Sequence, residues 1–106
     1  MTPDWRGIYP AVTTQFKSDL SLDINNTGRV VENLVNDGVH GLVMLGTCGE
    51  NTSLSPKEKL DVLRAAREAS NGRVPVVSGV AEFTTATACQ FARDAEAIGI
   101  DGLMIL

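Results

Sequence analysis

Short runs of consecutive apolar residues alternate along this chain with segments in which apolar residues recur every three or four positions. The runs are bounded by glycine or proline, and such runs are typical of strands buried on both faces. The segments between them have the period of amphipathic helices. The expected strands cover residues 7–12, 42–45, 75–80 and 102–106. Pro10 argues against a long first strand, because proline cannot donate a ladder hydrogen bond.

Three helices are expected between these strands, and each has a start signal. The sequence Ser55-Pro56-Lys57-Glu58 is a capping box with proline at the first helical position, and this helix should end near Asn71-Gly72. The other two helices are expected over residues 24–37, capped by Asp23 or Asn25, and from Thr84 or Thr85 to just before Gly99. Cys89 falls among the inward alanines of the last helix, where packing is its expected role.

The order strand, helix, strand, helix, strand, helix, strand predicts an α/β fold with parallel strands. The chain also repeats itself, since residues 38–45 (GVHGLVML) are echoed by residues 99–106 (GIDGLMIL) two strand-helix units later. Units of this size suit a (β/α)8 TIM barrel, which needs about 250 residues in total. The 106 residues are therefore expected to form the N-terminal part of one barrel domain, about strands 1–4, ending in or just after the fourth strand.

The polar residues that follow the second expected strand are the first candidate for a binding site. Residues 46–51 read Gly-Thr-Cys-Gly-Glu-Asn and lie at the carboxyl end of that strand, where α/β folds bind their ligands. Two glycines allow the backbone to approach a small anion and to direct successive N–H groups at it. This loop predicts a site for a carboxylate or a phosphate.

Charge and composition exclude several other classes of function. The formal net charge is −4 and the nine Lys and Arg residues are scattered, so neither nucleic acid nor an anionic membrane is an expected partner. No secretory leader or membrane-spanning run is present in these residues, which favours a soluble, cytoplasmic protein. The two cysteines, Cys48 and Cys89, form no C-x-x-C pair, so neither a disulfide nor a metal site is expected.

Four stretches of the sequence resemble one known family. Residues 10–16 (PAVTTQF) resemble the family pattern Pro-Ala-Leu-Val-Thr-Pro-Phe, and residues 38–50 resemble Gly-Val-x-Gly-Leu-x-x-x-Gly-Thr-Thr-Gly-Glu. Leu54-Ser55 with Glu58, and then residues 73–80 (RVPVVSGV), continue in register. Together they resemble the dihydrodipicolinate synthase and N-acetylneuraminate lyase family of pyruvate-handling class I aldolases.

The resemblance implies a TIM barrel in which a lysine forms a Schiff base with pyruvate or another 2-keto acid, with no further cofactor. By this resemblance Thr47, Cys48 and Gly49 bind the substrate carboxylate, and the Thr47 hydroxyl also belongs to a catalytic proton relay. A homo-oligomer, dimeric or tetrameric, and an aldehyde as possible second substrate are implied too. Synthase, lyase and dehydratase activities are not distinguished by these residues.

Two positions depart from the family pattern. Cys48 replaces a threonine, and a thiol is a weaker hydrogen-bond donor than a hydroxyl, so carboxylate affinity should depend more on backbone N–H groups. Glu82 stands where small polar residues are more usual, and it is a candidate to influence the second substrate. Glu50 is expected to be structural, accepting hydrogen bonds from loop amides, rather than to act as an acid or base.

The lysine that the chemistry needs is not expected within these residues. Lys17, Lys57 and Lys59 fall in a loop or on an outer helix, so none should form the Schiff base, and residues 1–106 alone should be inactive. Two other interpretations remain open. One is a small α/β module that binds a phosphate or nucleotide at the glycine loop. The other is a noncatalytic barrel fragment that assembles only with a partner.

Overall fold

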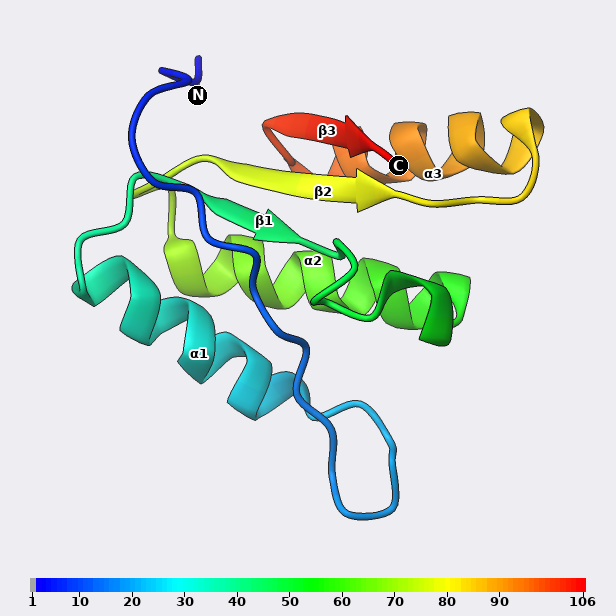
Figure 1. The fold of residues 1–106 in the computed structure, drawn as a ribbon, viewed down its shortest axis with the longest axis horizontal. Coiled ribbons are helices and arrows are strands. Elements are labelled where there is room, and N and C mark those ends of the chain that lie inside the picture. Colours follow the sequence, from blue (N-terminus) through cyan, green and yellow to red (C-terminus); the bar gives the residue numbers. More distant parts are fainter. Residues whose placement is uncertain (1) are drawn as a thin grey trace.

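The computed structural model describes residues 2–106 as an α/β fold built on a parallel sheet (Figure 1). The sheet contains β1 (Leu42–Met44), β2 (Val76–Val80) and β3 (Gly102–Ile105), in that spatial order. Leu42 pairs with Val76, and Val77 pairs with Gly102. The helices are α1 (Ile24–Asn36), α2 (Pro56–Ser70) and α3 (Thr85–Ile98), with a short 3-10 turn, η1 (Asn51–Ser53), before α2. All carboxyl ends of the strands therefore lie at one edge of the sheet.

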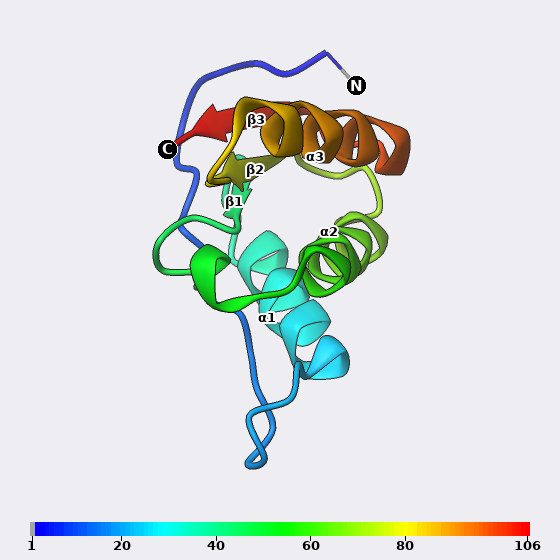
Figure 2. The same ribbon diagram turned by 90° about the vertical axis from the view of Figure 1, so that its right-hand side faces the viewer.

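All three helices lie on one side of the sheet, and the N-terminal segment passes along the opposite side (Figure 2). The helical side holds the core, because β1 and β2 are covered there by α2 and α3 while α1 packs on α2. Burying this much aliphatic surface is the main favourable contribution to folding. The core includes Leu42, Met44, Leu63, Val76, Val80 and Phe91.

The local start signals of the helices are confirmed. The Asp23 carboxylate accepts a hydrogen bond from the Asn26 amide at 3.0 Å, which caps α1 and holds the pKa of Asp23 below its ordinary value. At α2 the Ser55 and Glu58 side chains each accept from the other residue's amide, at 3.2 and 2.9 Å. Thr84 caps α3 through the amide of Thr87.

The expected first strand over residues 7–12 is corrected by the structure. Only Ala11 pairs with the sheet, in an isolated parallel bridge to Val43, although the Val43 amide also donates to the Pro10 carbonyl. Gly7 has a φ of 91°, which ends the extended conformation on one side, and Pro10 has no amide to donate. The segment lies beside β1, but it is too irregular to be a strand.

The central strand of the sheet and the edge strand β3 differ in burial. Every residue of β2 is buried, whereas Leu103, Met104 and Ile105 of β3 are exposed, Ile105 by 72%.

The prediction for Cys89 was wrong, since this cysteine is exposed on α3. The inward positions of α3 are Phe91 and Ala95, which lie four residues apart on one helical face.

Candidate functional site

A sharp turn of the backbone creates the loop that follows β1. The strand ends at Met44, one residue earlier than expected, because Leu45 adopts a φ of 57°. This left-handed conformation is costly for a leucine and persists only where the surroundings fix it. Gly79 of β2 permits the turn, since a Cβ at that position would stand 2.1 Å from the Leu45 carbonyl oxygen. Only a glycine on β2 allows the loop to begin in this way.

Three amides of the loop are satisfied within the loop itself. The amides of Gly49 and Asn51 both donate to the carbonyl of Gly46, at 3.1 and 3.3 Å, and the Glu50 amide donates to the carbonyl of Thr47 at 3.0 Å. The amides of Thr47 and Cys48, in contrast, donate to no acceptor within residues 2–106. Two successive N–H groups are thus left for an external acceptor, which suits a small anion.

The three residues singled out for the site occupy different environments. Thr47 and Cys48 are exposed at the tip of the loop, so both side chains are accessible to a ligand. Gly49 is buried, and its amide is already used by Gly46. A Cβ at Gly49 would come within 2.9 Å of the Leu45 nitrogen and 3.2 Å of the Val12 carbonyl oxygen. Gly49 therefore allows the loop to close on its own backbone, and it offers no amide to a ligand.

Two buried side chains hold the loop from behind. The Thr14 hydroxyl donates to the Gly49 carbonyl at 2.7 Å, across 35 positions of sequence. The Asn51 side-chain amide donates to the Leu45 carbonyl at 2.9 Å. Sequence reasoning assigned neither role, because both bonds depend on where distant segments meet. The hydroxyl and amide types are a weak signal by themselves, since such residues are common in loops.

The two acidic residues near this edge, Glu50 and Glu82, lie in different environments. Glu50 is exposed with a φ of 57°, and within residues 2–106 no loop amide donates to its carboxylate, so the expected bonds are absent there. Glu82, after β2, lies 2.8 Å from the Lys59 ammonium of α2, and both side chains are nearly buried, at 13% and 5% exposure. Lys59 is on the expected helix but faces inward, and its ammonium is engaged by Glu82.

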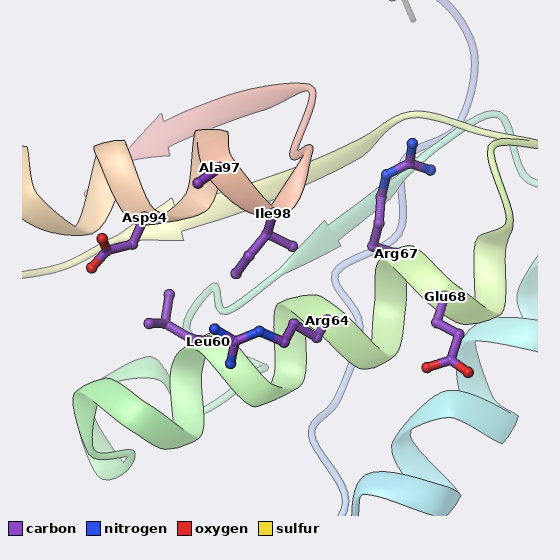
Figure 3. A pocket seen from close by; sticks show the side chains of 7 residues that line it. All are labelled: Leu60, Arg64, Arg67, Glu68, Asp94, Ala97 and Ile98. Atoms are coloured by element: carbon purple, nitrogen blue, oxygen red, sulfur yellow. The ribbon is translucent and has the colours of Figure 1, made fainter.

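A separate groove of about 530 Å³ opens between α2 and α3 (Figure 3). It is a poor anion site because its charges are mixed and partly engaged, with Arg64 already bonded to Asp61. Arg67 reaches Gly99 at the end of α3, where a cation stabilises the helix terminus. The groove is lined by Leu60, Arg64, Arg67, Glu68, Asp94, Ala97 and Ile98.

The described residues 2–106 offer neither a metal centre nor a membrane-spanning helix. They contain no group of three His, Cys, Asp or Glu side chains placed to hold a metal ion. Within the same residues, no helix combines the length and the apolar character needed to cross a membrane.

Comparison with known proteins places this geometry in a family. The model of the Dihydrodipicolinate synthetase family matches residues 4–106. An uncharacterized DapA-like lyase from Rhizobium meliloti is 38% identical over 103 residues, which cover 97% of this chain and 34% of the relative. The chain thus spans about a third of the length of the curated relative.

Solved structures of proteins from the same family have the same fold as this chain. A putative dihydrodipicolinate synthetase from Pseudomonas aeruginosa superposes with a TM-score of 0.92 at 33% identity, covering 96% of this chain and 35% of that one. A prophage protein of the dihydrodipicolinic acid synthase family from E. coli K12, solved in complex with pyruvate, gives 0.89 at 32% identity, with 95% and 34% covered. An N-acetylneuraminate lyase from Mycoplasma synoviae gives 0.90 at 27% identity, with 95% and 35% covered.

The fold is thus shared with proteins named as a dihydrodipicolinate synthetase and as an N-acetylneuraminate lyase. The family model covers nearly all of the residues that form the fold and the candidate site. This chain belongs to the dihydrodipicolinate synthetase family.

Proposed function

We propose that the loop after β1 binds the carboxylate of pyruvate or another 2-keto acid in a Schiff-base lyase. The observation that carries the proposal is the pair of unengaged amides at the exposed residues Thr47 and Cys48, on a loop in which the amides of residues 49–51 are bonded internally. A carboxylate can accept both N–H groups, and hydrogen bonds to an ionised acceptor are stronger than neutral ones. The exposed Thr47 hydroxyl is then placed beside the keto acid, where it serves the proton relay.

We infer the ligand, the complete fold and the position of the catalytic lysine from the family. A related prophage protein was solved in complex with pyruvate, which supports a keto acid as ligand. Helices on one side of a parallel sheet, together with the exposed β3, support an arc of a TIM barrel formed by the first four strand positions. The Schiff-base lysine then comes from a later part of the barrel. Residues 1–106 alone form no imine with pyruvate, and the complete protein is a homo-oligomer.

Phosphate binding by a stand-alone module is less well supported by the geometry. Helices bind phosphate through the free amides of their first turn. The N-terminus of α2 is already capped by Ser55 and Glu58, and η1 separates it from the loop. The two free amides of the loop are therefore not reinforced by a helix end, and they match a carboxylate better than a nucleotide phosphate.

The two cysteines offer a test with an internal control. Cys48 and Cys89 are both exposed, but only Cys48 lies in the loop. Iodoacetamide is applied to the complete protein with and without pyruvate, and the modification of each cysteine is followed by peptide mass spectrometry. Pyruvate should slow the modification of Cys48 several-fold and leave that of Cys89 unchanged. ADP at the same concentration should protect neither thiol.

Three results would contradict the proposal. Equal rates at Cys48 with and without saturating pyruvate would show that the keto acid does not occupy the loop. Protection of Cys48 by ADP alone would instead favour the phosphate-binding interpretation. Protection of both cysteines would indicate a change of the whole protein rather than a ligand in the loop.

A further inference from the structure

Asn51 links three parts of the structure behind the loop. Its side chain is 2% exposed, and its Nδ2 donates to the Leu45 carbonyl at 2.9 Å and to the Gly79 carbonyl at 3.4 Å. Its backbone amide donates to the Gly46 carbonyl at 3.3 Å. One residue thus connects the end of β1, the end of β2 and the start of η1.

The orientation of the side-chain amide is fixed by these neighbours. The reverse orientation would place the amide oxygen against two carbonyl oxygens, and two acceptors repel each other. In the observed orientation Oδ1 is buried and has no hydrogen-bond partner among residues 2–106. A buried acceptor without a partner lowers stability. Asn51 is therefore not the residue that best stabilises this position.

Asn51 supplies a hydrogen-bond donor for the Leu45 carbonyl, which an apolar residue at this position could not do. Leu45 has a φ of 57°, and its side chain is completely buried. The bond from Asn51 Nδ2 fixes the direction of the Leu45 carbonyl and so opposes the return of this residue to an ordinary conformation. The next residue, Gly46, supplies the carbonyl that takes up the amides of Gly49 and Asn51.

The free amides depend on this arrangement. If Leu45 relaxed, the Gly46 carbonyl would turn away from its two donors, and the amides of Thr47 and Cys48 would no longer be held outward. We infer that Asn51 is a positioning residue that keeps the loop in its anion-binding form, and this inference rests on the proposed function. It touches no substrate and acts through Leu45 and Gly46.

The test uses Asn51→Leu, which keeps the number and branching of the side-chain heavy atoms but removes both the donor and the unpaired oxygen. Asn51→Ala is a second variant that cannot clash. Ser70→Ala is the matched control, because Ser70 is equally buried and its hydroxyl donates to the Arg67 carbonyl at the far end of α2. In the complete protein, pyruvate affinity is measured by calorimetry, the melting temperature by calorimetric scanning, and exchange of the Gly49 amide by NMR.

The Asn51 variants should bind pyruvate at least tenfold more weakly and exchange the Gly49 amide at least tenfold faster. Their melting temperatures should stay within a few degrees of the wild type. A purely structural residue would give the opposite pattern, with a lower melting temperature and unchanged affinity. Ser70→Ala should leave both affinity and Gly49 exchange unchanged.

The outcomes separate this inference from the proposed function. If the wild type binds pyruvate and the Asn51 variants bind it equally well, the inference is overturned and the proposed function stands. If the wild type itself binds no pyruvate, the proposed function is overturned. In that case Gly49 exchange alone decides whether Asn51 holds the loop, and unchanged exchange refutes it.

Discussion

The loops that follow β1 and β2 leave the same edge of the sheet, yet they use their polar groups in opposite ways. After β1 the backbone bends sharply and leaves the amides of Thr47 and Cys48 without a partner within residues 2–106. After β2 the Glu82 carboxylate is bonded to Lys59 and largely withdrawn from solvent. One loop retains hydrogen-bonding capacity for a ligand, whereas the other has used its charge to join β2 to α2.

This difference shows why a charged residue near a strand end is not enough to identify a site. A buried pair of opposite charges satisfies itself, and its loss affects the fold before it affects a ligand. Unengaged backbone amides on an exposed loop have no such internal partner. We therefore expect changes around β1 to alter keto-acid binding and changes around β2 to alter stability, with Gly79 as the position where the two effects meet.

Gly79→Ala should have the largest effect, because it abolishes the close contact between the two regions. The new Cβ would stand 2.1 Å from the Leu45 carbonyl oxygen and 3.2 Å from the Gly46 nitrogen. Backbone atoms cannot yield as a flexible side chain does, so the loss of stability should reach about 3 kcal/mol, the upper part of the range for overpacking. Pyruvate binding should be lost as well. Urea unfolding and calorimetric titration check the two effects, and wild-type affinity in this variant would refute the role of the turn.

Lys59→Met should lower the stability of the protein and leave pyruvate binding intact. Removal of one member of the Lys59–Glu82 pair leaves the other charge buried, which costs about 3 kcal/mol. The double variant Lys59→Met with Glu82→Leu should recover much of that stability. Pyruvate affinity should remain within a factor of two in both variants. A large loss of affinity in the double variant would show that the loop after β2 is part of the carboxylate site.

Cys48→Thr should have the smallest effect. It replaces the exposed thiol with a hydroxyl, a better donor, beside the same two backbone amides. Pyruvate affinity should be preserved or tightened by no more than about 1 kcal/mol, the usual value of one hydrogen bond. Calorimetry on the complete protein measures this change. A large loss would assign the thiol a role of its own.

The features that the sequence predicted well are those set by neighbouring residues. Ser55 and Glu58 lie three positions apart and cap α2 with no help from the rest of the chain. The strands at β1 and β2 were predicted within one residue at each end, because runs of apolar residues bounded by glycine or proline define them. The exposed positions of Thr47 and Cys48 on a loop after β1 also follow from local sequence.

The features that were missed depend on contacts between distant residues. The left-handed Leu45 and its bond from Asn51 require the approach of Gly79, which is 34 positions away from Leu45 (79 minus 45). Lys59 is buried only because Glu82 meets it across 23 positions. The first strand failed for a different reason, since a short apolar run does not show whether a segment with Gly7 at its start and Pro10 within it can form a regular ladder.

The central claim is that a keto-acid carboxylate binds the free amides of the loop after β1. A crystal structure of the complete protein with pyruvate tests it most directly. We expect a carboxylate oxygen within about 3 Å of the amide nitrogens of Thr47 and Cys48, the usual length of such a hydrogen bond. Pyruvate bound elsewhere, with these two amides bonded to protein carbonyls, would contradict the account.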